Sequence, residues 1–273
     1  MPLIKQLNDA TLSENYNMLI VGESGSGKTT LASTAPGKKF FFQFDQGGLE
    51  SVIGKSSQAH VEYATLYPQP HLKPVKTPAI ATIQGGDPCS SWAQANKLLG
   101  QFTKECPYDV VVVDSLTSMA LAAWTYVRAR QGLEPGEIPK QAGAGTRELY
   151  QALGEQSLMF FYGVLALPCS KIFIAHETSE KDERTGAFKY KIAGEGRMFG
   201  DKLSDGKQFS QIFRTEALSL EDDTVKYQVV TRGSSGFPTK SRWANLNATE
   251  EPDIAAMLAK ATSSATVAEP TKS

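Results

Sequence analysis

Cysteine and histidine are scarce in this chain of 273 residues. The three cysteines, Cys89, Cys106 and Cys169, are odd in number and far apart in the sequence, and the three histidines show no ligand spacing. A disulfide framework or a structural zinc site needs a more regular set of ligands. The sequence therefore predicts a reducing compartment and thiols that serve ordinary packing.

Long apolar runs and an excess of one charge are also lacking. No run approaches the ~18 apolar residues of a membrane-spanning helix, and the first residues do not have the design of a signal peptide. The net charge is −1, so nucleic-acid binding would need a local patch of cations. Hydrophobic residues make up 41% of the chain and charged residues 21%, which fits a globular protein with a sizeable core.

One stretch carries a specific chemical signal. Residues 22–29 read Gly-Glu-Ser-Gly-Ser-Gly-Lys-Thr, after an apolar run at 17–21 and before a helix-compatible run at 29–35. Strand, G-x-x-x-x-G-K-[ST] and helix, in that order, predict a phosphate-binding P-loop. Its backbone N–H groups would cradle phosphate oxygens. The alternative is a surface turn rich in glycine and serine. The candidate nucleotide-binding residues are Gly22, Glu23, Ser24, Gly25, Ser26, Gly27, Lys28, Thr29 and Thr30.

A second motif lies downstream, where four consecutive valines at 110–113 are followed by Asp114. A buried parallel strand that ends in a carboxylate is typical of the Walker B motif, which serves the metal of a bound nucleotide. Thr29 and Asp114 are therefore the candidate Mg²⁺ residues, and Lys28 would reach the β- and γ-phosphates. In the alternative interpretation Asp114 caps the next helix, a role that Ser115 or Thr117 could fill instead.

Polar residues also follow two other predicted strands. Asp45 comes after the strand at 39–44, and His176 and Glu177 come after the strand at 171–175. Ligand residues of α/β sheets lie at such strand ends. We expect Asp45 to position the attacking water, and His176 or Glu177 to sense the γ-phosphate. The alternatives are a turn aspartate before glycine and a hydrogen-bonded structural histidine.

The chain reads as one domain over residues 1–261, with an irregular proline-rich and glycine-rich insertion at about 67–90 and a disordered tail at 262–273. Further helices are predicted at 90–104, 116–131, 147–166 and 252–260, and further strands at 61–64, 209–215, 217–220 and 225–231.

The segment at 179–207 is polar and rich in glycine, and within it residues 188–191 alternate aromatic and cationic side chains. That alternation suits stacking on single-stranded bases; the alternative is a solvated β-hairpin. The candidate DNA-binding residues are Arg184, Phe188, Lys189, Tyr190, Lys191 and Arg197.

From 17 to about 246 the order of these features resembles the RecA-like ATPases, most closely a short phage-encoded branch that includes single-strand annealing recombinases. The resemblance implies the roles given above for Lys28, Thr29 and Asp114. It implies that Asp45 polarises water, although the family more often has glutamate near this position, which favours slow hydrolysis. It also implies that Lys240 and Arg242 form a Lys-x-Arg pair that enters a neighbouring subunit's nucleotide site. Two exposed cations on an edge strand are the alternative.

The resemblance implies a RecA-like α/β fold: a mainly parallel twisted sheet, helices on both faces and C-terminal β-hairpins. The expected protein binds ATP and Mg²⁺, is a slow ATPase, and forms a homo-oligomeric ring or filament. It binds single-stranded DNA and promotes annealing or recombination in the cytoplasm of a bacterial host cell, where a single-strand binding protein is a further expected partner. The alternatives are a DNA-dependent motor or helicase-like loader, a P-loop small-molecule kinase, and a nucleotide-binding scaffold without turnover.

Overall fold

The computed structural model describes residues 15–55, 60–67, 88–131, 144–181, 183–184, 186, 188–193, 203, 206–233 and 238–263. The elements follow in the order β1 (Asn17–Gly22), α1 (Lys28–Ser33), β2 (Lys39–Gln43), the 3-10 helix η2 (Gly48–Val52), β3 (Val61–Thr65), α2 (Pro88–Phe102), β4 (Val110–Asp114), α3 (Leu116–Arg130), α4 (Ala144–Leu165), β5 (Ser170–Lys181), β6 (Phe188–Ile192), β7 (Gln211–Ser219), β8 (Val225–Val230), β9 (Lys240–Ser241), β10 (Thr249–Glu250) and α6 (Ile254–Thr262).

One sheet organises the molecule, with the strand order β10-β8-β7-β1-β5-β4-β2-β3. The strands from β7 through β1, β5, β4 and β2 to β3 are all parallel, whereas β8, β9 and β10 add antiparallel strands at the C-terminal side. β5 lies between β1 and β4, and because all three are parallel their carboxyl ends meet at one edge of the sheet. The predicted α/β fold with a mainly parallel sheet is confirmed.

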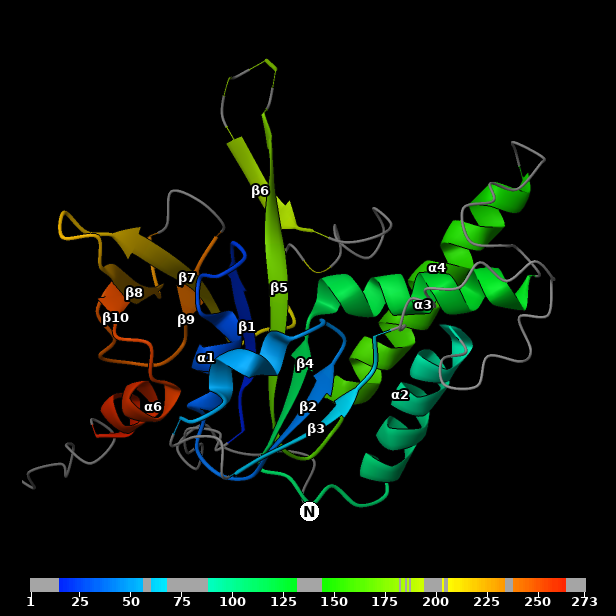
Figure 1. Ribbon diagram of the computed structural model, residues 1–273, viewed down its shortest axis with the longest axis horizontal. Coiled ribbons are helices and arrows are strands. Elements are labelled where there is room, and N and C mark those ends of the chain that lie inside the picture. Colours follow the sequence, from blue (N-terminus) through cyan, green and yellow to red (C-terminus); the bar gives the residue numbers. More distant parts are fainter. Residues whose placement is uncertain are drawn as a thin grey trace, which may run out of the picture.

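Both faces of the sheet are covered (Figure 1). In β1, Leu19 and Val21 join a core formed with α2, α3 and α4, whereas Met18 and Ile20 join a second core formed with α1 and α6. Side chains alternate between the faces of a strand, so a strand covered on both faces reads as an unbroken apolar run. The valines of β4, all buried, follow the same rule.

Short local patterns in the sequence determine where the helices α1 and α3 end and begin. α1 ends before Pro36-Gly37, and Gly37 has a φ of +83° where an added Cβ would lie 2.4 Å from a carboxylate oxygen of Asp109. α3 begins at Leu116 and is capped by Ser115, whose hydroxyl accepts a hydrogen bond from the N–H of Ser118 at 3.3 Å. The cap of this helix is therefore Ser115 and not Asp114, which leaves the aspartate carboxylate for another role.

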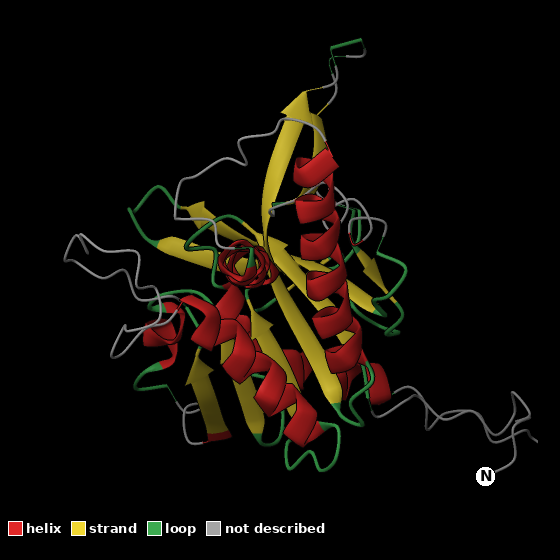
Figure 2. Ribbon diagram, turned by 90° about the vertical axis from the view of Figure 1, so that its right-hand side faces the viewer, coloured by secondary structure: helices red, strands yellow, loops and turns green. Residues whose placement is uncertain are grey.

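β5 and β6 form a hairpin that projects beyond the rest of the sheet (Figures 1 and 2). The predicted strand at 171–175 continues to Lys181, because β6 pairs with its outer half from Glu177 to Lys181. The side chains of this outer half are polar and do not alternate clearly between apolar and polar residues. The apolar pattern that predicts the strand therefore stops at Ala175. The polar, glycine-rich segment at 179–207 therefore begins within a β-hairpin, the structure that the alternative interpretation names.

Other boundaries differ in smaller ways. The two strands predicted at 209–215 and 217–220 are one continuous strand, β7, because Glu216 at the predicted break is paired within the sheet. Most of the insertion predicted at 67–90, and residues 264–273 of the predicted tail, lie outside the described residues. Among the helices that the structure describes, none is long and apolar enough to cross a membrane.

Candidate nucleotide site

The loop between β1 and α1 holds a fixed shape that depends on glycine. Gly25 and Gly27 have φ values of +79° and +89°, in the left-handed region that other residues avoid. At Gly22 an added Cβ would lie 2.6 Å from the hydroxyls of both Ser26 and Thr215. The two hydroxyls lie 2.7 Å apart and link the loop to β7. The loop therefore has the backbone conformation of a phosphate cradle, supported from β7.

Lys28 lies inside this loop and is 6% exposed. Its Nζ donates hydrogen bonds to the carbonyl oxygens of Gly22 at 3.0 Å and Glu23 at 2.6 Å. Burial lowers the pKa of the Lys28 ammonium, and the carboxylates of Asp114 and Asp45 act in the opposite direction. The nearby carboxylates favour the charged form of Lys28, and a buried positive charge is suited to bind a phosphate.

Asp114 ends β4 beside the first turn of α1. The Thr29 hydroxyl donates to its Oδ2 at 2.8 Å. The carboxyl is 1% exposed, and burial, with a contribution from Asp45, raises the pKa of Asp114 to about 6. Its backbone carbonyl accepts hydrogen bonds from the N–H groups of Phe44 and Asp45, which fixes the end of β4 against β2.

The donors at this point fit Mg²⁺. Thr29 and Asp114 offer a hydroxyl and a carboxylate oxygen, the hard ligands that Mg²⁺ prefers. Within the part of the chain that the structure describes, no group of three His, Cys, Asp or Glu side chains is placed to hold a metal ion. A sparse protein site of this kind suits a metal that keeps its waters and shares substrate phosphate oxygens.

Asp45 lies beside this pair with an ordered carboxylate. Its Oδ1 accepts hydrogen bonds from the hydroxyls of Ser115, at 3.2 Å, and Ser118, and its Oδ2 lies 3.5 Å from Nε2 of His176. Burial acts to raise the pKa of Asp45, but hydrogen bonds from His176, Ser118 and Ser115 outweigh it and leave the pKa below its ordinary value. The carboxylate is therefore ionised at neutral pH and held in one orientation.

These groups face one cavity of about 780 Å³, a volume in the usual range for small-molecule sites. The lining residues are Ser24, Gly25, Ser26, Gly27, Lys28, Thr29, Thr30, Asp45, Gln46, Gly47, Gly48, Ser51, Lys55, Asp114, His176, Tyr227 and Pro252. The structure thus brings together most of the predicted nucleotide residues, with Asp45, Asp114 and His176 around the P-loop. Gly22 and Glu23 do not line the cavity, but their backbone carbonyls accept hydrogen bonds from the Lys28 ammonium.

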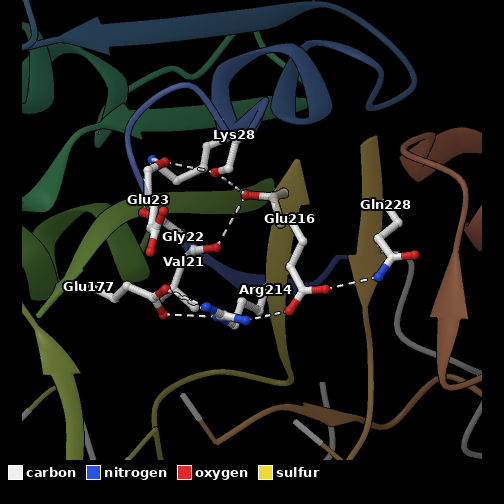
Figure 3. Close-up of polar contacts among 10 residues, drawn as sticks. Val21, Gly22, Glu23, Lys28, Glu177, Arg214, Glu216 and Gln228 are labelled. Atoms are coloured by element: carbon white, nitrogen blue, oxygen red, sulfur yellow. Dashed lines mark hydrogen bonds and ion pairs between the residues drawn. The ribbon is translucent and has the colours of Figure 1, made fainter. Parts of the chain in front are cut away.

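Glu177 requires a correction, because it does not line this cavity. Its carboxylate makes a bidentate ion pair with Arg214 on β7, with N–O distances of 2.8 and 3.0 Å (Figure 3). Arg214 also pairs with Glu216, which accepts a hydrogen bond from Gln228 of β8. The predicted contact of Glu177 with the γ-phosphate is therefore replaced by a structural pairing between β5 and β7.

Lys240 and Arg242 lie away from the cavity of their own chain. β9 pairs with the first residues of β7, Gln211 and Ile212, which are level with the start of β1 and not with the P-loop at its end. The Lys240 ammonium donates to the carbonyl of Gly206, and Arg242 is exposed. Their action in a neighbouring subunit's site stays a prediction.

The predicted DNA residues lie mainly on the β5–β6 hairpin. Phe188 is 59% exposed, Arg184 is exposed, and Lys191 lies 3.2 Å from Glu180 on the paired strand. Tyr190 is half-buried against the core. Arg197 lies outside the described residues.

Several residues in or beside the site could not be recognised in the sequence. Thr215 and Tyr227 come from strands about 200 positions after the P-loop, and their positions depend on how β7 and β8 pair with β1. Pro252 lies in the turn before α6. The sequence gives only a weak indication of the role of Ser118, which is its position three residues after the cap of α3.

Comparison with known proteins places the chain in a family. The model of the AAA domain family matches residues 14–243. No curated protein sequence matches. Among solved structures, a KaiC-like protein from the hyperthermophilic archaeon Pyrococcus horikoshii OT3 is similar at 12% identity and a TM-score of 0.33, over 79% of this chain and 77% of that one. A likeness this weak says nothing of what the present chain binds or does.

The family match and the geometry agree. The matched region contains the P-loop, Lys28, Thr29 and Asp114, and it contains all the parallel strands that bring them together. The chain belongs to the AAA domain family and is an ATP-binding protein with an α/β P-loop NTPase core.

Proposed function

We propose that this protein is a Mg²⁺-dependent ATPase in which Asp45 orients the water that attacks the γ-phosphate. The observation that carries this proposal is the position of the Asp45 carboxylate, which lines the same cavity as Lys28 and the Thr29–Asp114 pair. A catalytic base must be ionised and correctly placed before substrate arrives. The hydrogen bonds from Ser115, Ser118 and His176 satisfy both conditions.

The other residues of the cavity bind the phosphates, the metal and the nucleoside. The P-loop amides and Lys28 bind and orient the phosphates, and Thr29 with Asp114 holds the metal. When bound, Mg²⁺ neutralises charge that develops on the phosphate oxygens. Tyr227 and Pro252 supply an aromatic and an apolar part of the lining, suited to a nucleoside.

Substitution Asp45→Asn tests this assignment. The amide keeps the shape of the side chain but removes the base, so kcat is expected to fall by about 100-fold or more while the Kd for ATP stays within about threefold. Glu50→Gln is the matched control, because Glu50 is an exposed carboxylate on η2 that does not line the cavity. A wild-type kcat in Asp45→Asn would show that another group orients the water.

The same proposal includes single-stranded DNA as the polymer on which the ATPase acts, with annealing or recombination as the outcome. Support comes from the β5–β6 hairpin, which projects beyond the rest of the sheet (Figure 1). Its strand β6 carries the exposed ring of Phe188 and the cation of Lys191. Exposed aromatic rings stack on bases, and nearby cations bind the phosphate backbone. The resemblance to phage recombinases described above supports the same conclusion.

Fluorescence anisotropy with a labelled single-stranded oligonucleotide tests this part. Wild-type protein is expected to bind with an affinity that falls as salt rises, and Phe188→Ala is expected to weaken binding by about fivefold or more. Tyr63→Ala is the control, since Tyr63 is 58% exposed on β3 at the other end of the sheet. Absence of salt-dependent binding would reduce the proposal to an ATPase without DNA.

We also propose that Lys240 and Arg242 act in the nucleotide site of a neighbouring subunit of a homo-oligomer. Their distance from the cavity of their own chain and the exposure of Arg242 support this role. An arginine that acts in trans stabilises charge on the transferred phosphoryl group.

A further inference from the structure

Two cysteines that are 63 positions apart in the sequence lie side by side in the fold. Cys106, in the segment between α2 and β4, donates a weak hydrogen bond to the Sγ of Cys169, and the two sulfurs are 3.9 Å apart. Cys169 directly precedes β5, and β4 and β5 are paired from Val110 and Ser170 onward. Both thiols are free, as the sequence analysis expects, but the fold brings together two cysteines that the sequence gives no reason to pair.

The two thiols differ in access. Cys106 is half-buried, whereas Cys169 is 3% exposed. Burial, reinforced by the neighbouring Cys106, raises the pKa of the Cys169 thiol to about 12. An oxidant from solvent therefore reaches Cys106 first, and Cys169 is the buried thiol that lies within reach of it.

We propose that Cys106 and Cys169 form a reversible disulfide, so that this pair is an oxidation site on the side of the sheet away from the nucleotide cavity. The S–S bond requires the sulfurs to approach from 3.9 Å to about 2.05 Å. Cys106 lies in the segment before β4, which includes residues outside regular structure from Thr103 to Asp109, and this segment can supply the movement.

The reaction is an exchange with a low-molecular-weight disulfide, RS–SR. The Cys106 thiolate attacks one sulfur, and RS⁻ leaves and takes up a proton as RSH. Cys169 then loses its proton and attacks the Sγ of Cys106 in the mixed disulfide, which releases the second RSH. Two electrons pass from the protein sulfurs to the oxidant.

The bond would join the starts of β4 and β5 while leaving the cavity unchanged. Asp114 lies at the far end of β4, and His176 lies beyond the part of β5 that pairs with β4, so both are remote from the cysteines. The cross-link would close a loop of about 60 residues and restrict the unfolded chain. Oxidation is therefore expected to stabilise the fold without changing nucleotide affinity.

Oxidised glutathione on the folded full-length chain tests the proposal. After alkylation of remaining thiols and digestion with trypsin, mass spectrometry is expected to find peptide 105–128 joined to peptide 148–171. The Tm is expected to rise by about 5–10 °C and to return after reduction. The affinity for ATP is expected to stay within twofold of the reduced protein.

Variants separate this pair from the third cysteine. Cys89→Ser is expected to leave the cross-link intact, and Cys106→Ser and Cys169→Ser are each expected to abolish it. If a serine variant does not fold, the wild-type peptide map remains decisive. Stable glutathione on Cys106 with Cys169 still free for alkylation after unfolding, or no loss of thiols at all, would overturn the proposal.

Discussion

At the scale of single residues, the P-loop is supported by a hydroxyl contributed from β7. Thr215 is 2% exposed, and its Oγ1 lies 2.7 Å from Ser26 Oγ and donates to the carbonyl of Val21 at 3.3 Å. The same hydroxyl occupies the space beside Gly22 that a side chain would need. Thr215 thus positions the loop from beneath and does not itself line the nucleotide cavity.

Thr215→Val tests this positioning role. Valine keeps the volume but removes the hydroxyl that links Ser26 to β7 and leaves Ser26 only the Glu23 carbonyl as a partner. We therefore expect the Kd for ATP to rise about fivefold and the free energy of unfolding to fall by about 1 kcal/mol. Thr215→Ser is the matched control, because it keeps the hydroxyl, and it should retain most of the affinity. Calorimetric titration with Mg-ATP and urea unfolding measure the two quantities. Equal affinity in the valine and serine variants would refute the role.

The sequence predicts some site residues and not others for a physical reason. Gly22 to Thr29 form a local structure, so a short pattern specifies them, and Asp114 follows because a run of valines ends at it. Asp45 and His176 were predicted from strand ends that parallel pairing brings together. Tyr227 depends on the register of an antiparallel strand that no short pattern encodes.

At the scale of elements, the hairpin is attached to the sheet by a nearly buried ion pair. The side chains of Glu177 on β5 and Arg214 on β7 are 5% and 17% exposed. The hydrogen bonds that Arg214 donates to the Glu177 carboxylate raise the pKa of the Arg214 guanidinium above its ordinary value. The two strands flank β1, so this pair joins the base of the hairpin to the strand that supports the P-loop (Figure 3).

Arg214→Ala is expected to lower the free energy of unfolding by about 2–3 kcal/mol, because it leaves the Glu177 carboxylate buried without a partner. The double variant Glu177→Leu with Arg214→Leu should recover much of this loss, since no charge is then left unpaired. Lys226→Ala is the control: its pair with Glu251 is exposed, and exposed pairs contribute ~0–1 kcal/mol. Urea unfolding measures all three, and a change below about 0.5 kcal/mol in Arg214→Ala would contradict the account.

This ion pair also helps to explain why the sequence predicts the end of β5 too early, at Ala175 and not at Lys181. The pattern at 171–175 is apolar because helices cover both faces of β5 there, and the prediction ended where that cover ends. Beyond Ala175 the strand is held by pairing with β6 and by Glu177, which a hydrophobic pattern does not report. The sequence pattern therefore predicts that Glu177 contacts the ligand, whereas the structure pairs Glu177 with Arg214.

At the scale of the whole molecule, the two ends of the sheet differ. β3, which is partly exposed, lies at one end beside the buried strand β2 that leads to Asp45. The β7–β9 region with Lys240 and Arg242 lies toward the other end. Subunits that contact one another head to tail would bring the second end of one chain to the first end of the next. A ring or filament of this kind places the Lys-x-Arg pair near a neighbouring cavity, in keeping with the proposed trans role.

Mixing two inactive variants tests that arrangement. Arg242→Ala removes the proposed trans residue, and Lys28→Ala removes phosphate binding. In an equimolar mixture about a quarter of the interfaces combine an intact cavity with an intact Arg242, so ATPase activity should return to about a quarter of wild type. Mixing Arg242→Ala with the double variant Lys28→Ala/Arg242→Ala should give no rescue. Mixed oligomers seen by native mass spectrometry without any return of activity would contradict the trans role.

The central claim is that the P-loop cavity binds ATP through Lys28, and equilibrium titration with Mg-ATP tests it most directly. Lys28 is the buried cation of the cavity whose ammonium already lies within the loop, so we expect Lys28→Ala to raise the Kd by about 100-fold or more. Lys104→Ala, at an exposed position after α2, should bind as wild type does. Binding of ATP by a folded Lys28→Ala protein with the wild-type Kd would contradict the account.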